Sequence, residues 1–140
     1  MRRSGEAQTR RTRSRRPRRF PKSIVAAIDA SKILGVRAGA RSAHRFIGIW
    51  VVVVDGRVFA RSWSLRPDGW FHALRKDPLG VIQVGDRAIR VRASVVRSQR
   101  IRVAVEDAYT LKYATPASKK FVRGFRTARR RDSTTEFLPR

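Results

Sequence analysis

The side chains able to carry out nucleophilic, acid–base or metal chemistry are few in this chain. There is no cysteine, which excludes thiolate catalysis and cysteine-ligated metals. His44 and His72 lie far apart, and neither has a carboxylate at ligand spacing, so no metal site is expected. A glycosidase-like pair of carboxylates is also disfavoured, because four aspartates occupy turn or cap positions: Asp55, Asp68, Asp77 and Asp86.

Arginine is the most frequent charged residue of the chain. The formal charge is +24, and arginine outnumbers lysine 28 to 6. Guanidinium groups make bidentate contacts with phosphates, so a nucleic acid or another polyanion is one predicted partner. The candidate contacts are Arg15, Arg16, Arg18, Arg19, Arg90 and Arg92. No aromatic side chains are interleaved with them, which favours phosphate-backbone attraction over base recognition. Arginine bias in a GC-rich genome predicts the same composition, and both interpretations stay open.

Residues 1–20 are predicted to form a disordered arginine-rich tail, and residues 21–140 a single domain. The tail has almost no apolar side chain, so burial cannot offset the entropy lost on ordering. Its composition is that of a transit peptide, but it lacks an apolar face, and a start codon downstream of Met1 is a further alternative. No apolar run approaches the roughly 20 residues that cross a bilayer, so no membrane partner is expected. The absence of cysteine fits a cytoplasmic location.

Apolar alternation and turn signals predict a mostly β domain with flanking helices. The expected strands are residues 33–37, 46–54, 57–64, 81–84, 88–95 and 134–138. The expected helices are residues 23–32, 70–77 and one that follows Ser98, with Ser23, Asp68 and Ser98 as caps. Residues 114–131 are expected to be irregular, with one helical turn at 119–122.

Three segments carry most of this prediction. Residues 46–54 form a nearly continuous apolar run, which predicts a central strand buried on both faces. Asp55-Gly56 is a type I′ turn signal. In residues 88–95, Arg90 and Arg92 alternate with apolar side chains, so one face of that strand is buried. The helix after Ser98 is expected to bury a stripe of Ile101, Ala104, Val105, Ala108 and Leu111.

The order of these elements resembles the FMN-binding split-barrel superfamily, and within it the small deazaflavin-dependent nitroreductase-like proteins. The resemblance is carried by a helix with Trp70, Phe71 and Leu74 that stops before Pro78 and precedes a hairpin. Residues 108–113 and 134–140 are similar to a related bacterial domain-of-unknown-function family. The resemblance covers roughly residues 33–140. It implies a six-stranded split β-barrel and a homodimer with its cofactor groove between two subunits.

The resemblance also implies FMN or deazaflavin as cofactor and an oxidoreductase activity, with cofactor chemistry rather than a catalytic triad. Arg41 and Arg45 would clamp the phosphate, and Ser42 would donate a hydrogen bond to it. These residues lie in the loop over 38–45, which keeps some residues of the relatives' phosphate-contacting sequence but not its pattern. A solvated Arg41 without a ligand is the alternative.

Arg61, Ser62 and Trp63 lie where the relatives contact the flavin ring. Ser62 would hydrogen-bond a ring carbonyl, and Trp63 would pack on the ring. The glycine-rich stretch that follows in the relatives is replaced by residues 64–69, and Ala73 replaces an asparagine that is frequent there. Trp70 and Phe71 are expected to be core residues. A non-catalytic basic barrel, with or without a polyanion partner, therefore stays an alternative to the oxidoreductase.

Overall fold

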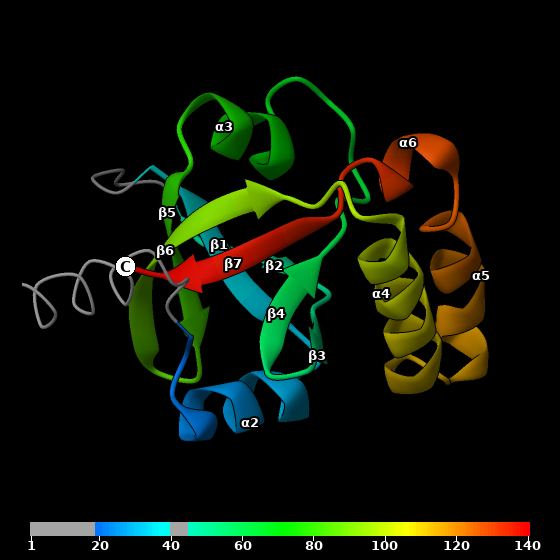
Figure 1. Cartoon of the computed structure of the whole chain (residues 1–140), viewed down its shortest axis with the longest axis horizontal. Helices are drawn as coiled ribbons and strands as arrows, with labels where there is room; N and C mark the ends of the chain where they lie inside the picture. Colours follow the sequence, from blue (N-terminus) through cyan, green and yellow to red (C-terminus); the bar gives the residue numbers. More distant parts are fainter. Residues whose placement is uncertain (1–18, 40–44) are drawn as a thin grey trace, which may run out of the picture.

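The computed structural model describes residues 19–39 and 45–140 (Figure 1). Most of the predicted tail lies outside the described residues, as do several predicted site residues: Arg15, Arg16, Arg18, Arg41 and Ser42. His44 also lies outside them. The described chain forms one seven-stranded antiparallel sheet with helices around it. In the described part, no helix is both long enough and apolar enough to traverse a bilayer.

The sheet has the strand order β2-β1-β5-β6-β7-β4-β3. The strands are β1 (Leu34–Ala38), β2 (Ile47–Ile49), β3 (Val52–Val54), β4 (Arg57–Ala60), β5 (Leu79–Val84), β6 (Arg87–Val95) and β7 (Thr135–Pro139). The end strands β2 and β3 are separated in the chain only by Trp50 and Val51, so the sheet must curl until its two ends lie close together (Figure 1). This curled sheet with flanking helices confirms the predicted split-barrel fold.

Two short helices contribute to the core enclosed by the curled sheet. Helix α2 (Lys22–Ala30) lies at one end of the sheet, and helix α3 (Trp70–Lys76) at the other (Figure 1). Ile28 of α2 and Leu74 of α3 are buried in one cluster with sheet residues such as Phe137. Burial of these side chains removes apolar surface from water, which is the main force that holds the sheet curled.

A second apolar cluster lies outside the barrel, under helix α4 (Gln99–Lys112) and helix α5 (Pro116–Gly124). Helix α4 packs on β3, and α5 packs on α4. The cluster contains buried side chains from both layers: Val52, Phe59, Val105, Tyr109, Val122 and Phe125. The short helix α6 (Ala128–Arg131) follows before the chain enters β7. Figure 1 shows these helices stacked on one side of the sheet.

Several local predictions are confirmed. Asp55 and Gly56 have φ angles of 51° and 73°, as a type I′ turn requires. On β6, Val91 is buried while Arg90 and Arg92 are exposed. The Ser98 hydroxyl accepts a hydrogen bond from the Ile101 N–H at 3.3 Å and so caps α4. Trp70 and Phe71 are buried core residues, as expected.

The prediction of one central strand over 46–54 is wrong, because the chain is divided there into the two end strands β2 and β3. Side chains of α4 and of its C-cap residue Tyr113 form hydrogen bonds with the backbone groups at the break. The Tyr109 hydroxyl donates to the Trp50 carbonyl at 3.0 Å, and the Val51 N–H donates to the Tyr113 hydroxyl at 3.0 Å. Lys112 Nζ donates to the Val51 carbonyl at 2.8 Å. The division also gives seven strands rather than the expected six.

Two predicted helix caps are also wrong. Helix α2 begins at Lys22 with Pro21 in the cap position, so Ser23 lies inside the helix. Gly69 is the N-cap of α3 and no side chain caps it, while the Asp68 carboxylate lies 3.5 Å from Arg66 Nε.

The predicted ends and faces of three other segments differ from the structure. In the apolar stripe expected on α4, Val105 is buried as predicted, but Leu111 is 82% exposed, and Tyr109, which was not expected in the stripe, is buried. The segment 114–131 is largely helical, because Pro116 begins α5 at a position where the absent N–H costs nothing. The strand expected over 57–64 ends at Ala60.

Candidate cofactor groove

A groove of about 410 Å³ lies between β2, the segment after β4 and helix α5. Five of its lining side chains are aromatic, and they include all three tryptophans of the chain: Trp50, Trp63, Trp70, Phe121 and Phe125. Residues Ile47–Ile49 of the edge strand β2 form the opposite wall. Its volume falls within the range of about 300–1,000 Å³ that is typical of small-molecule sites. The groove is therefore large enough for a planar aromatic ligand.

Trp50 is held in the groove wall by α4. Its ring stacks on Tyr113 with the ring centres 4.2 Å apart and an interplanar angle of 3°. The Tyr113 hydroxyl accepts from the Val51 N–H and donates to the Lys32 carbonyl at 2.6 Å. Burial raises the pKa of Tyr113 to about 12, so the hydroxyl keeps its proton near neutral pH. The break between β2 and β3 thus places a rigid indole beside the groove.

Trp63 is packed against α5 yet stays 42% exposed. Its ring makes edge contacts with Phe121 and Phe125, at centre distances of 5.1 and 5.5 Å. The Arg130 guanidinium lies 4.0 Å from the Trp63 ring centre, and Arg130 Nε donates to the Trp63 carbonyl at 2.9 Å. A Cβ on Gly124 would lie 2.5 Å from two carbons of the Trp63 ring. Only glycine therefore permits this approach of α5 to the indole.

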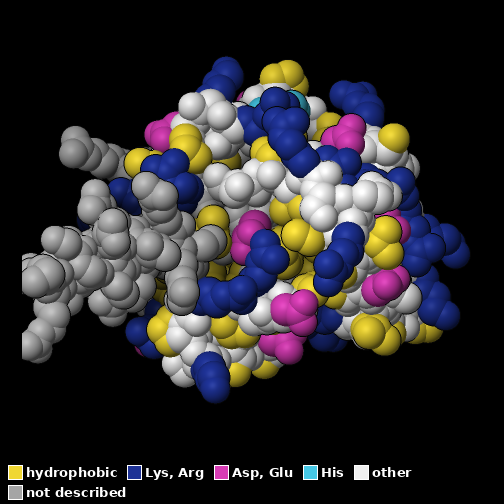
Figure 2. Space-filling model, in the orientation of Figure 1, with side chains coloured by type: hydrophobic (Ala, Val, Ile, Leu, Met, Phe, Trp, Pro, Cys, Tyr) yellow, Lys and Arg dark blue, Asp and Glu magenta, His cyan; other side chains and the backbone are white. Residues whose placement is uncertain are grey.

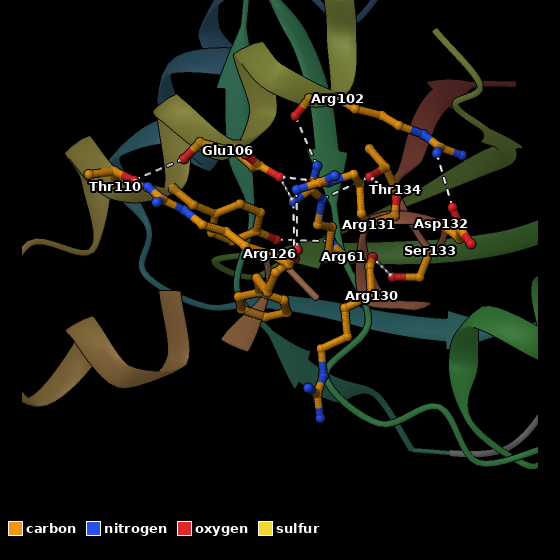
Figure 3. Close-up of polar contacts among 12 residues, drawn as sticks. Arg61, Arg102, Glu106, Thr110, Arg126, Arg130, Arg131, Asp132, Ser133 and Thr134 are labelled. Atoms are coloured by element: carbon orange, nitrogen blue, oxygen red, sulfur yellow. Dashed lines mark hydrogen bonds and ion pairs between the residues drawn. The ribbon is translucent and has the colours of Figure 1, made fainter. Parts of the chain in front are cut away.

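Arg61 is 1% exposed and ties the end of β4 to three other elements (Figure 3). Its Nε donates to Thr134 Oγ1 at 2.8 Å, and its Nη2 donates to the Arg102 carbonyl at 2.9 Å. Its Nη1 donates both to Glu106 Oε1 at 3.2 Å and to the Phe125 carbonyl at 3.0 Å. The guanidinium that lines the groove is thus already bonded within the chain.

Glu106 is the carboxylate partner of this buried arginine. It accepts from Arg61 and, at 2.9 Å, from Arg131 Nε. Burial alone would raise the pKa of Glu106, but hydrogen bonds and charges from the two arginines outweigh it and lower the pKa. Burial lowers the pKa of Arg61, and Glu106 counteracts that effect. The cluster is therefore an internal network in which two arginines bond the same oxygen of one carboxylate.

The structure brings together some of the predicted cofactor residues. Arg61 and Trp63 both line the groove, and Arg45 is exposed two residues before the β2 wall. Ser62 is fully buried: its N–H donates to Ser133 Oγ at 2.8 Å, and its hydroxyl donates to the Ser64 carbonyl. Cofactor binding by these residues stays a prediction.

The predicted polyanion contacts that the structure describes lie elsewhere. Arg90 and Arg92 are exposed on β6, and Arg19 Nη1 donates to the Asp55 carbonyl at 3.0 Å. Within residues 19–39 and 45–140, no group of three or more metal-ligating side chains is found.

The sequence reasoning missed three side chains of the groove: Trp50, Phe121 and Phe125. Trp50 was hidden inside an apolar run that resembled a plain strand. Phe121 and Phe125 are four residues apart, a spacing that places two side chains on one helix face. That spacing was the available signal, and the expectation of an irregular segment over 114–131 obscured it.

A curled antiparallel sheet whose end strands meet, with helices at both ends, defines a split β-barrel, and solved structures share this fold. Rv2991, a conserved hypothetical protein from Mycobacterium tuberculosis, has a TM-score of 0.56 and 14% identity, over 89% of this chain and 82% of that chain. The F420-H2 dependent reductase FDR-A has a TM-score of 0.53 and 14% identity, over 76% of this chain and 93% of that chain. An FAD-binding protein from Mesorhizobium loti has a TM-score of 0.51 and 11% identity, over 86% of this chain and 88% of that chain.

The chain belongs to DUF2255, a family of uncharacterised proteins conserved in bacteria, which it matches over residues 24–137. This confirms the resemblance to a bacterial family of unknown function within the split-barrel proteins. No curated protein matches the sequence. At identities of 11–14% the structural likeness establishes the fold alone.

Proposed function

We propose that this protein binds a flavin or deazaflavin in the aromatic groove and acts as an oxidoreductase of the nitroreductase-like kind. The observation that carries the proposal is the groove itself, which has a volume of about 410 Å³, is lined by five aromatic side chains and lies beside the edge strand β2. Flat aromatic rings pack well against such walls. Among proteins of this fold, one is an F420-H2 dependent reductase and one is an FAD-binding protein.

The groove residues fit the ring of such a cofactor. Trp63 and Phe121 are partly exposed, and Ile47 offers an apolar wall across from them. Arg45, next to this wall, is proposed to contact the phosphate end together with Arg41 and Ser42. The bound cofactor would supply hydride transfer. The residues of the chain would hold and orient it, and the apolar walls would exclude water from one side.

The test uses the three tryptophans, since all of them line the groove. FMN, FAD and F420 are each titrated into the full chain while tryptophan emission and visible absorbance are recorded. A bound ring is expected to quench the tryptophans and to shift its own absorbance band. Trp63→Ala should weaken this binding. All three tryptophans line the groove, so the control is Phe46→Leu, a change at an aromatic side chain that does not line it. Absence of any change in tryptophan emission and in visible absorbance with all three cofactors would reject the oxidoreductase function.

A homodimer in the cytoplasm is part of the same proposal. β2 is an end strand, and Ile47 on it is 45% exposed, while Ile33 just before β1 is 52% exposed. Exposed apolar side chains at a sheet edge favour pairing with another copy. Light scattering on the purified chain should give twice the monomer mass, and Ile47→Glu should shift it to the monomer. A monomeric parent protein would exclude the dimer.

Polyanion binding is the second candidate function. Arg87, Arg90 and Arg92 are exposed on β6, and none forms an ion pair with a carboxylate among the described residues. Together with the arginine-rich tail they would contact phosphates without base preference. Counterion release then predicts a log–log slope of affinity against salt of roughly −6 to −8 that shrinks when residues 1–19 are removed. A shallow slope would favour genomic arginine bias.

A further inference from the structure

The partly exposed aromatic side chains of the groove lie beside cations. Lys120 Nζ is 5.2 Å from the centre of the Phe121 ring, and the Arg130 guanidinium is 4.0 Å from that of Trp63. Lys120 and Arg123 also line a shallow hollow on α5, and Phe121 is shared by this hollow and the groove. Only the Phe121 side chain therefore separates a ligand in the groove from the positive charges of Lys120 and Arg123.

The charge at this end of the groove is not balanced within the described chain. Residues 119–131 contain seven basic side chains and no acidic one. Of these basic side chains, Arg131 alone forms an ion pair in the described part of the protein, with Glu106. No carboxylate lines the groove or the hollow. Figure 2 shows dark blue side chains gathered on the side where α4 to α6 lie.

The orientation of Arg130 agrees with this picture. Arg61 and Arg131 point toward the Glu106 carboxylate, whereas Arg130 points away from that cluster (Figure 3). Its Nε is bonded to the Trp63 carbonyl, which holds the guanidinium over the indole. The positive charge of Arg130 is therefore fixed beside the groove and is not paired with a carboxylate of the described chain.

We infer that the groove takes an anionic aromatic ligand, with its planar part against the partly exposed side chains of Trp63 and Phe121 and its negative group at Lys120 and Arg123. The inference rests on the proposed function in taking this groove as the ligand site. It adds a second charged group at the α5 end of the groove, away from the phosphate contacts proposed at Arg45, so this charge belongs to the substrate and not to the phosphate of the cofactor. A carboxylate, phosphate or sulfonate on an aromatic ring meets this description, since each forms charge-assisted contacts with lysine and arginine.

Two dyes with the same ring system provide the test. 8-Anilinonaphthalene-1-sulfonate carries one negative charge, and N-phenyl-1-naphthylamine lacks it. Dye fluorescence reports binding, and its loss in Trp63→Ala, which removes one wall of the groove, assigns the binding to the groove. We expect the anionic dye to bind about three- to tenfold more tightly, the effect of two solvent-exposed charges. The preference should shrink at about 0.5 M salt, where screening shortens the reach of these charges.

The variant K120Q/R123Q should have a clearly smaller preference for the anionic dye, with Arg130 still beside the groove, and an unchanged affinity for the neutral dye. Both side chains are exposed, so the fold is expected to tolerate the change. R90Q/R92Q removes two exposed arginines from β6 and serves as the matched control, with the preference retained. Two results would overturn the inference. One is equal affinity of the parent protein for both dyes, and the other is a preference for the anionic dye in K120Q/R123Q that is as large as in the parent protein.

Competition with FMN separates this inference from the proposed function. If FMN displaces the anionic dye, the flavin and the dye share the groove, and both proposals stand. If no flavin or deazaflavin binds while the dyes are still distinguished by charge, the oxidoreductase proposal fails and the inference about the anionic ligand is upheld.

Discussion

Replacement of Tyr109 by phenylalanine tests whether α4 holds the break between β2 and β3. The Tyr109 side chain is 1% exposed. Its hydroxyl accepts from the Arg61 N–H at 2.9 Å and donates to the Trp50 carbonyl at 3.0 Å. Tyr109→Phe keeps the ring, which stacks on Phe125 at 4.8 Å, and removes only these two bonds.

The expected cost follows from the two groups left behind. One buried donor and one buried acceptor lose their partner, and each such loss costs about 1–3 kcal/mol, so we expect a total of about 2–6 kcal/mol. For a domain of this size that corresponds to a fall in melting temperature of about 6–18 °C, at roughly 3 °C per kcal/mol. Urea unfolding followed by tryptophan fluorescence measures the free energy directly.

Thr110→Ala is the matched control, because it removes an exposed hydroxyl from the adjacent position on the same helix. A change of about 0.5 kcal/mol or less is expected there. If Tyr109→Phe cost no more than Thr110→Ala, the hydroxyl would not hold the strand break and the account of Trp50 would be refuted.

Alkaline pH gives an independent check of the same residue. Burial raises the pKa of Tyr109 above its ordinary value of 10.0, so the folded protein keeps the proton that the unfolded chain releases. Folding stability is then fully present below about pH 10, the ordinary tyrosine pKa, and declines as pH rises above it. Tyr109→Phe should lose less stability than the parent protein over that interval, although Tyr113, with its pKa raised to about 12, still contributes.

Three further predictions concern the groove and the tail. Gly124→Ala should displace Trp63, because its Cβ would lie 2.5 Å from the indole, and should weaken dye and FMN binding; unchanged binding would contradict the close approach. Arg41→Ala and Arg45→Ala should each weaken FMN binding by about 1.5–3 kcal/mol, and Ser62→Ala by about 0.5–1.5 kcal/mol, as measured by calorimetry. Removal of residues 1–19 should leave the melting temperature unchanged, since the buried Phe20 is retained, and a loss of several degrees would show that the tail docks.

Local patterns predicted those parts of the fold whose cause is local. The φ angles at Asp55 and Gly56, the cap at Ser98 and the alternation on β6 each depend on a few neighbouring residues. The break after Ile49 depends instead on hydroxyls of Tyr109 and Tyr113, about sixty positions further along the chain. No pattern within 46–54 reveals those partners.

The candidate site was predicted in part for the same reason. Trp63 stood out as an aromatic side chain near the end of the strand predicted over 57–64, and it does line the groove. Arg61 was assigned to a cofactor, although four of its contacts lie within the protein. Its partners Glu106 and Thr134 are 45 and 73 residues away, so only the folded arrangement shows that they meet.

The position of β7 also bears on how the chain is made. β7 follows every other strand in the sequence, yet it lies between β6 and β4 in the sheet. During synthesis the chain therefore emerges as two separate ladders, β2-β1-β5-β6 and β4-β3, each with an open edge. Until Thr135–Pro139 arrives, those edges are free to pair with other nascent chains. Chains that stop before Thr135 are thus the ones most prone to aggregate.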